Sequence, residues 1–346
     1  MEFALDERQQ AIADLAGDVL DGTGADAPER AWKALGQAGL LSLGVPTRLG
    51  GDGLGVVETG VLLTEVGRRA VPVPALATLA LGVLPVARWG SDEQQEELLP
   101  AVASGGVLLT AAVREPSEPM PVVPGAVADG LVVTGTKVGV AYAEQAHRIL
   151  VPVTVSGGGS AVALVDPRAP GASLTRTPVS GATPEYTLRM EGARAAGMLG
   201  TATADDLYRY AVAGTCALGD GVLAGALALT TAHIGTREQF GRPLAAFQAV
   251  AQQIADVYVA SRTVRLAALS ACWRLSASTA DCDADLEVAA YWLAHEAPAA
   301  LRTCHHLHGG IGLDISYPLH RYSALVRDLV RSLGGAEYRL ERLRVR

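Results

Sequence analysis

The feature that most constrains the fold is that the spacing of apolar residues changes twice along the 346-residue chain. Residues 1–108 carry apolar residues at helical spacing between short Gly/Pro turns, and Asp6 is placed to cap a first helix. Residues 109–202 instead contain short runs rich in β-branched residues, and from 203 to 346 the helical period returns in longer segments. We therefore expect an α+β, mainly α protein with three domains at these bounds.

The middle domain is predicted to consist of β-strands. Apolar runs at 131–134, 149–153 and 161–165 are short and β-branched, and turn residues such as Asp129 and Gly130 separate them. This spacing is typical of an antiparallel β-domain, either a sandwich or a barrel.

The last domain is predicted to be a four-helix bundle with a short tail helix. Its first segment, 205–236, has almost no charge beyond Tyr210, so we expect a helix that is buried on most sides. In the next helix an apolar stripe is expected at four positions: Val250, Ile254, Val257 and Tyr258.

One uncharged stretch of 18 residues, 70–87, is nearly long enough to span a membrane. Pro72, Pro74 and Pro85 lie within it, and prolines remove backbone hydrogen bonds from a helix. We therefore expect a buried helix with a proline-rich lead-in, no membrane span, and a soluble protein.

Composition excludes several classes of protein. The net charge of −8, with no basic run before the C-terminus, argues against nucleic-acid binding. The four cysteines show no CxxC spacing and fit reduced core thiols. The acidic start, 1–7, lacks the basic and apolar regions of a signal peptide, so a cytoplasmic location is expected.

Common catalytic motifs are absent from the sequence. It contains no GxGxxG after a strand, no GxxxxGK[ST], no GxSxG and no HExxH. His305, His306 and His308 form a local cluster, but neighbouring residues complete no metal-ligand spacing, so we predict no metal site.

Two segments of the last domain carry candidate binding residues. Residues 237–241 read Arg-Glu-Gln-Phe-Gly and are followed by Phe247 and Gln248. Arg237 at a helix end could donate to a diphosphate, or it could be a surface arginine favoured by the helix dipole. The glycines of 306–312 would let backbone N–H groups approach an anion, or would simply end a helix.

Together, in this order and spacing, the two segments resemble the C-terminal domain of the acyl-CoA dehydrogenase family. The family patterns R-x-x-F-G…Q and Q-x-x-G-G-x-G are met, except that His306 stands where Gln is usual. The residues predicted to bind cofactor are Arg237, Gln239, Phe240, Gln248, His306, Gly309, Gly310 and Gly312. Further matches lie at Gly39-Leu40, Val45-Pro46, Gly50-Gly51, Glu115-Pro116, Gly135-Thr136-Lys137 and 317–322.

The resemblance implies FAD-dependent α,β-dehydrogenation of an acyl-CoA thioester. In this family a carboxylate removes the α-proton as hydride passes from the β-carbon to the flavin. The Arg and Gly-rich motifs of one subunit hold FAD that is bound mainly by its neighbour, so a tetramer built as a dimer of dimers is implied.

The sequence departs from the family where the catalytic base is expected. A Glu usually occupies one of two places, one after the fourth bundle helix and one early in the first. Here the first place holds Leu333 or Gly334, depending on a one-residue gap, and the second holds Tyr208. Glu337, about one helical turn beyond the lost position, is a weak candidate for a displaced base.

The expected flavin-ring contacts of the β-domain are also missing. The family's G-x-G-S-D turn is replaced by residues 117–121, Ser-Glu-Pro-Met-Pro. The usual Trp and hydroxyl residue are replaced by Gly139 and Ala141. The residues that would serve a neighbour's FAD remain, whereas those that would serve the chain's own flavin are lost.

We therefore expect the non-catalytic partner in an α2β2 acyl-CoA dehydrogenase. The other subunit would be an acyl-CoA dehydrogenase-like catalytic chain that supplies the Glu, and FAD would be shared between the two. Such pairs are known in the family among actinobacterial enzymes acting on steroid-derived CoA thioesters, and an electron-transfer flavoprotein-type acceptor is implied. Three alternatives stay open: a homotetramer using a displaced base such as Glu337, a flavin monooxygenase or oxidase on the same fold, and a structural paralogue without FAD.

Overall fold

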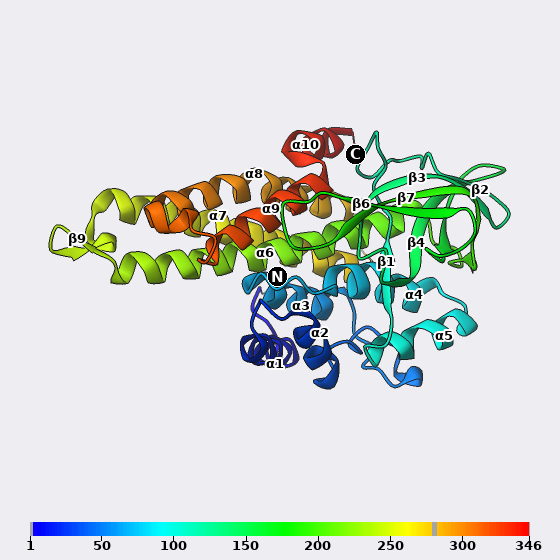
Figure 1. Cartoon of the computed structure of the whole chain (residues 1–346), viewed down its shortest axis with the longest axis horizontal. Helices are drawn as coiled ribbons and strands as arrows, with labels where there is room; N and C mark the ends of the chain where they lie inside the picture. The colour runs from blue at the N-terminus through cyan, green and yellow to red at the C-terminus, as the bar shows by residue number, and fades with distance from the viewer. Residues whose placement is uncertain (1–2, 279–281, 346) are drawn as a thin grey trace.

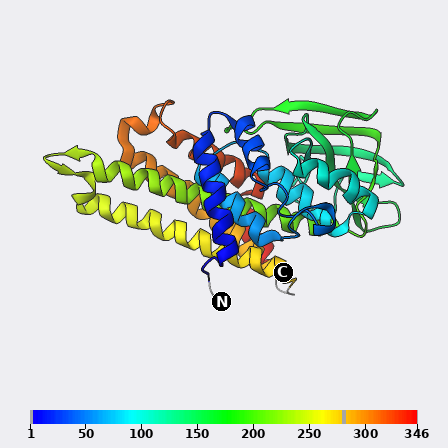
Figure 2. The same ribbon diagram turned by 90° about the horizontal axis from the view of Figure 1, so that it is seen from below.

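The structure, a computed structural model, describes residues 3–278 and 282–345, so the first two residues of the acidic N-terminal segment lie outside it. Helices of the N-terminal part lie along one side of a bundle of long helices (Figure 1). A β-sheet covers one end of the bundle, and a hairpin forms the tip at the other end (Figures 1 and 2). The predicted mainly helical α+β fold is confirmed, while the domain bounds 1–108, 109–202 and 203–346 stay a prediction.

The N-terminal part consists of five α-helices and a π-helical segment, Leu76–Val83. The α-helices are α1 (Glu7–Thr23), α2 (Pro28–Gln37), α3 (Val56–Arg68), α4 (Leu84–Trp89) and α5 (Asp92–Ala103). Asp6 caps α1 as predicted, because its carboxylate accepts a hydrogen bond from the N–H of Gln9. The uncharged stretch is also as predicted: the proline-rich lead-in ends at the π-helical segment, which is buried from Ala77 onward.

The middle part is one eight-stranded sheet with the strand order β6-β7-β3-β2-β4-β5-β8, and β1 pairs with β4. The strands are β1 (Leu108–Ala111), β2 (Val127–Asp129), β3 (Val132–Ala141), β4 (Ala146–Val155), β5 (Ser160–Val165), β6 (Ala172–Thr177), β7 (Glu185–Arg194) and β8 (Gly197–Met198). The three predicted runs lie in β3, β4 and β5. The antiparallel prediction needs a correction, since β1 and β2 pair with β4 in parallel. Neither is joined to β4 by a tight turn, so nothing forces the antiparallel direction.

The last part contains four long helices and a tail helix, as predicted. They are α6 (Ala204–Thr236), α7 (Gln248–Ser276), α8 (Cys282–His308), α9 (Leu319–Leu333) and α10 (Gly335–Val345). Short strands β9 (Glu238–Gln239) and β10 (Arg242–Pro243) form the hairpin between α6 and α7. By length and composition α6 could cross a membrane, but 78% of its apolar window is buried inside the protein, as in a core helix.

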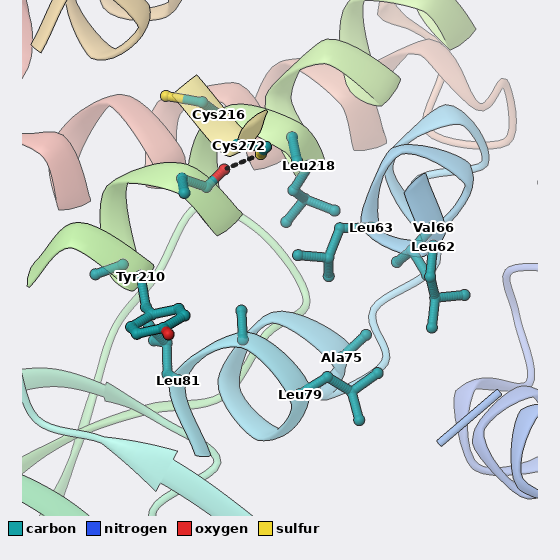
Figure 3. Packing of buried hydrophobic residues seen from close by; sticks show 14 of the residues in the cluster. Leu62, Leu63, Val66, Ala75, Leu79, Leu81, Tyr210, Cys216, Leu218 and Cys272 are labelled. Atoms are coloured by element: carbon teal, nitrogen blue, oxygen red, sulfur yellow. Dashed lines mark hydrogen bonds between the residues drawn. The ribbon is translucent and has the colours of Figure 1, made fainter. Parts of the chain in front are cut away.

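The apolar stripe predicted for α7 is only partly correct. Val257 is buried, but Tyr258 is 52% exposed and the neighbouring Val259 is 61% exposed. Adjacent residues on a helix differ by about 100° in direction, so both cannot face the same core. All four cysteine side chains are buried; Cys272 lies in the core with Leu63 and Tyr210 (Figure 3).

Three glycines bring α3 and α6 into backbone contact. A Cβ at Gly221 would lie 1.9 Å from the carbonyl oxygen of Thr64, and one at Gly225 would lie 2.1 Å from that of Arg68. In the opposite direction, a Cβ at Gly67 would lie 2.1 Å from the carbonyl oxygen of Leu218. Backbone atoms cannot move aside as flexible side chains do, so the N-terminal part is fixed against the bundle at one distance.

We predict that Gly221→Ala destabilises the protein by about 1–3 kcal/mol, the usual range for an overpacked core. Gly235→Ala is the matched control on the same helix, because a Cβ there meets nothing within 4 Å. Because alanine has a better helix propensity than glycine, this substitution should leave the stability unchanged or raise it by up to about 1 kcal/mol. Urea unfolding of the two variants measures both effects, and equal stabilities would contradict the close α3–α6 contact.

Candidate functional site

The main cavity lies where the N-terminal helices, the sheet and the bundle meet, and its volume is about 570 Å³. We call it the central cleft. Its walls include Leu76, Thr215 and Leu329 from three separate parts of the chain. Gly139 and Ala141, which stand where the family resemblance places an aromatic and a hydroxyl residue, both line it.

Arg114 fills the space that a side chain at position 139 would need. Gly139 has a φ of +63°, and a Cβ there would lie 2.4 Å from Nη1 of Arg114 and 3.0 Å from Oε2 of Glu185. Nε of Arg114 is buried without a hydrogen-bond partner among the described residues. A side chain at position 139 would therefore require the guanidinium of Arg114 to move.

Neither inherited position for the catalytic base carries a carboxylate. Leu333 is fully buried. Gly334 ends α9 with a φ of +85°, and a Cβ there would lie 2.6 Å from Cγ of Pro119 and 2.6 Å from Cδ1 of Tyr338. Tyr208 is buried near the start of α6, and burial raises the pKa of its phenol well above the ordinary value. The predicted absence of a base at these positions thus has a steric reason at Gly334.

Glu337 lies on α10, where it is exposed, and it does not line the central cleft. Three carboxylates do line the cleft, and each already pairs with an arginine. Asp26 is 2.6 Å from Arg321, whereas Glu185 and Asp328 lie 2.8 and 3.2 Å from Arg331. A carboxylate held by a guanidinium is a poor base for a carbon acid.

The segment 117–121 is held away from the sheet by the tail helix. The hydroxyl of Tyr338 donates to Oε1 of Glu118, and Arg342 donates to the carbonyl oxygen of Met120. Met120 itself is almost fully buried. These contacts attach to the bundle the segment that replaces the family's glycine-rich turn.

Glu115 and Lys137, two residues that carry the family resemblance, form a buried ion pair with 2.6 Å between Oε1 and Nζ. Glu115 also accepts hydrogen bonds from the backbone N–H groups of Gly125 and Ala126. Although burial disfavours its charge, Lys137 and these donors hold the pKa of Glu115 below its usual value. For Lys137, the effect of burial is larger than the opposing effect of the Glu115 charge, so the pKa of Lys137 is lowered. The pair fixes the loop that leads into β2.

A second, open cavity of about 340 Å³ lies toward the tip of the bundle, and we call it the tip hollow. Arg237, His306 and Gly309, all predicted from the sequence, line it together. These residues come together because two helices end here. Arg237 follows the last residue of α6, and Gly309 has a φ of +59° where α8 ends.

The other predicted binding residues lie around the tip hollow but do not line it. Gln239 and Phe240 belong to the β9–β10 hairpin, and Phe240 is 93% exposed. Gln248 begins α7 and is exposed. A Cβ at Gly310 would meet nothing within 4 Å, whereas one at Gly312 would lie 3.0 Å from Cβ of His308. Gly310 thus leaves open space, and Gly312 serves the packing of the loop.

Two residues of the tip hollow were missed by the sequence analysis. The rings of His233 and His308 stack with centroids 4.4 Å apart, and His308 also bonds to the hydroxyl of Tyr317 at 3.0 Å. Burial, and after it Arg237, lowers the pKa of His233, and burial lowers that of His308. A signal existed, because His233 precedes Arg237 by four residues and thus shares its helix face. Across residues 3–278 and 282–345, no group of three or more His, Cys, Asp or Glu could hold a metal ion.

A helical part, a sheet and a long bundle, with a cleft between them and a donor-lined hollow at the tip, define the fold class. The family model for the N-terminal domain of acyl-CoA dehydrogenases matches residues 7–106, and the model for the C-terminal domain matches residues 206–340. The chain belongs to the acyl-CoA dehydrogenase family.

Similar proteins support this assignment over the full length. The chain is 46% identical to acyl-CoA dehydrogenase FadE28 of Mycobacterium tuberculosis, covering 100% of this chain and 99% of the relative. It matches a chain of the ChsE4-ChsE5 complex from Mycobacterium tuberculosis with a TM-score of 0.90 and 32% identity, covering 99% and 98% of the two chains. A variant of the Tcur3481-Tcur3483 steroid ACAD matches with a TM-score of 0.91 and 33% identity, covering 97% and 96%.

Members of this family bind FAD, and the two cavities differ in how well they suit it. At the tip hollow the exposed Arg237 and the open space at Gly309 and Gly310 fit the phosphates and adenosine of a dinucleotide. In the central cleft, Gly139 and Ala141 supply neither the aromatic wall nor the hydroxyl expected beside a flavin ring, so the residues present fit the ring poorly.

We predict that Lys137→Met destabilises the protein by about 3–5 kcal/mol, because it leaves the Glu115 carboxylate buried without its cation. Arg189→Met is the control in the same sheet, since its ion pair with Glu191 is largely exposed, and it should cost less than about 1 kcal/mol. The contribution of ionised Glu115 to folding stability is complete at a pH above the ordinary carboxyl pKa. It declines as the pH falls through the lowered pKa of Glu115 in the folded protein. Urea unfolding at neutral and acidic pH measures this, and an unchanged midpoint for Lys137→Met would contradict it.

Proposed function

We infer that this chain is the non-catalytic subunit of an α2β2, FAD-dependent acyl-CoA dehydrogenase. The observation that carries the proposal is the closed base position, where Pro119 and Tyr338 leave no room for a side chain at Gly334. The carboxylates that line the central cleft are paired with Arg321 or Arg331, so they offer no replacement. A related subunit must therefore supply the Glu that removes the α-proton.

The length of α6 supports sharing of the cofactor between subunits. Leu218 of α6 lines the central cleft, and Arg237, at the tip hollow, lies 19 positions further along. At 1.5 Å per residue this is about 28 Å, so the tip hollow lies far from the cleft in which the chain's own flavin ring would lie. The tip hollow of this chain therefore serves FAD whose flavin ring lies in a neighbouring subunit.

In this arrangement the chain's own residues bind and orient rather than react. Arg237 donates to the FAD pyrophosphate, and the backbone at Gly309 and Gly310 approaches the adenosine end. Gln239, Phe240, Gln248 and His306 surround the same ligand from the hairpin, α7 and α8. Bound FAD supplies the hydride acceptor, and the partner supplies the ring contacts, the base and the acyl pocket.

The relatives support the finer parts of this proposal. ChsE4-ChsE5 is a complex of differently named components, which supports a hetero-oligomer. Tcur3481-Tcur3483 is a steroid ACAD, so we propose steroid-derived CoA thioesters as the substrate class. We also propose an electron-transfer flavoprotein-type acceptor and a cytoplasmic location.

The proposal predicts that the purified chain alone lacks stoichiometric flavin and dehydrogenase turnover. Co-expression with a related chain that carries the Glu should give a yellow complex with turnover. The visible spectrum and an acyl-CoA oxidation assay measure both. Stoichiometric flavin with turnover in the lone chain would overturn the proposal, and loss of that turnover in Glu337→Gln would then identify the displaced base.

Within the complex, Arg237→Gln should weaken FAD binding by roughly tenfold or more, because it removes a charge-assisted donor to the pyrophosphate. With saturating FAD, kcat should be close to that of the unmodified complex, since Arg237 does not touch the reacting atoms. Arg302→Gln is the control, because Arg302 is exposed on α8 but does not line the tip hollow. Fluorescence titration with FAD measures the affinity, and equal affinities for both variants would contradict the assigned role.

A further inference from the structure

The central cleft is open although it does not fit a flavin. Its volume of about 570 Å³ is within the range of about 300–1,000 Å³ that is common for small-molecule sites. Apolar side chains form most of the wall: Val73, Leu76, Ala77, Leu218, Leu325 and Leu329.

Four charged residues form a cluster at the polar end of the cleft, and three of them, Arg114, Glu185 and Asp328, line it. Arg331 of α9 donates to Glu185 of β7 and to Asp328, with N–O distances of 2.8 and 3.2 Å. Asp328 also accepts from the backbone N–H groups of Ser180 and Gly181. Arg331 and the two carboxylates therefore bind one another and the loop before β7, although Oε2 of Glu185 is buried without a hydrogen-bond partner among the described residues.

Arg114 is the residue of this cluster with an unpartnered donor among the described residues. It lines the cleft, and its Nε has no hydrogen-bond partner in the described part of the chain. Burial, and after it the charge of Arg331, lowers the pKa of Arg114, while Glu185 and Asp328 oppose this. A half-buried guanidinium with donors to spare is stabilised by an oxygen acceptor.

We propose that the central cleft binds, without converting it, a mostly apolar molecule with one oxygen acceptor at its end. The apolar body lies against the α6, α9 and π-helical walls, and a carbonyl or carboxylate oxygen accepts hydrogen bonds from Arg114. A cationic end is disfavoured because it would meet the guanidinium of Arg114, which lines the cleft. Each carboxylate that lines the cleft is bound to Arg321 or Arg331, so we assign no reaction to this site. This site is separate from the tip hollow and does not depend on the proposed subunit role.

Three probes of equal chain length test the ligand chemistry on the full-length chain: decanoate, decan-2-one and decyltrimethylammonium. Isothermal titration should show that decanoate or decan-2-one binds about tenfold more tightly than the cation, a factor that corresponds to about 1.4 kcal/mol. The stronger of the two distinguishes a carboxylate from a carbonyl ligand. Equal affinity for all three, or no binding at millimolar concentration, would overturn the proposal.

Variants locate the binding. Arg114→Met keeps the length of the side chain but removes its donors, so it should abolish the preference for the oxygen-bearing probes. Ala324→Trp should block the cleft, because Ala324 lines it. Arg327→Met is the control, since Arg327 is exposed on α9 and does not line the cleft. If the probes bind Arg114→Met and Ala324→Trp as they bind Arg327→Met, the site lies elsewhere and the proposal fails.

A measurement on the unaltered protein covers the case in which a variant does not fold. Met120 lines the cleft, whereas Met190 is buried in the sheet. In methyl-labelled protein the NMR signal of Met120 should shift on addition of decanoate, and that of Met190 should stay in place. Shifts of Met190 alone would contradict the site. Because this test needs neither partner nor FAD, its failure would leave the proposed subunit role untouched.

Discussion

The close approach of α3 and α6 is the constraint on which the rest of the molecule depends. Because Gly67, Gly221 and Gly225 allow backbone contact, the N-terminal helices lie at one fixed distance from the bundle. The same contact sets the width of the central cleft. Val66 and Leu218, which flank these glycines, are themselves part of the cleft wall. Without the α3–α6 contact, the apolar wall of the cleft would have no defined shape, and the cleft could not select a molecule by size.

In the proposed function the two ends of α6 carry separate tasks, and the residues expected for a flavin ring are missing at only one of them. At the tip, Arg237 and the glycines at 309 and 310 remain open to a ligand. At the cleft, the flavin-ring contacts have given way to Gly139 and Ala141, and Arg114 has taken the space. A uniform loss of function would have altered both ends. Selective loss is the pattern expected of a subunit that completes another chain's cofactor site.

Periodicity predicted most helices and strands because local spacing reflects which face is buried. It could not predict the parallel pairing of β1 and β2 with β4, since strand direction depends on contacts between distant segments. Periodicity could not predict the stacking of His233 on His308 either, because this contact also joins distant segments. The four-residue spacing between His233 and Arg237 indicated only that these two residues share a helix face. The missing base was visible in the sequence. The steric reason why no side chain fits at Gly334 was not visible in the sequence, because it depends on contact with Pro119, more than 200 residues away.

In the proposed subunit, which has no flavin ring of its own, the charged cluster at the cleft joins the sheet to the bundle. A flavin ring between sheet and bundle would contribute contacts to both, and removing it leaves the two parts in need of another connection. Arg331 of α9 reaches Glu185 of β7, and Asp328 holds the loop before β7 through two backbone N–H groups. These direct bonds replace cofactor-mediated contact with protein–protein contact. A cleft joined in this way retains its shape whether or not it is filled, which is the physical requirement for a binding site that has no chemistry of its own.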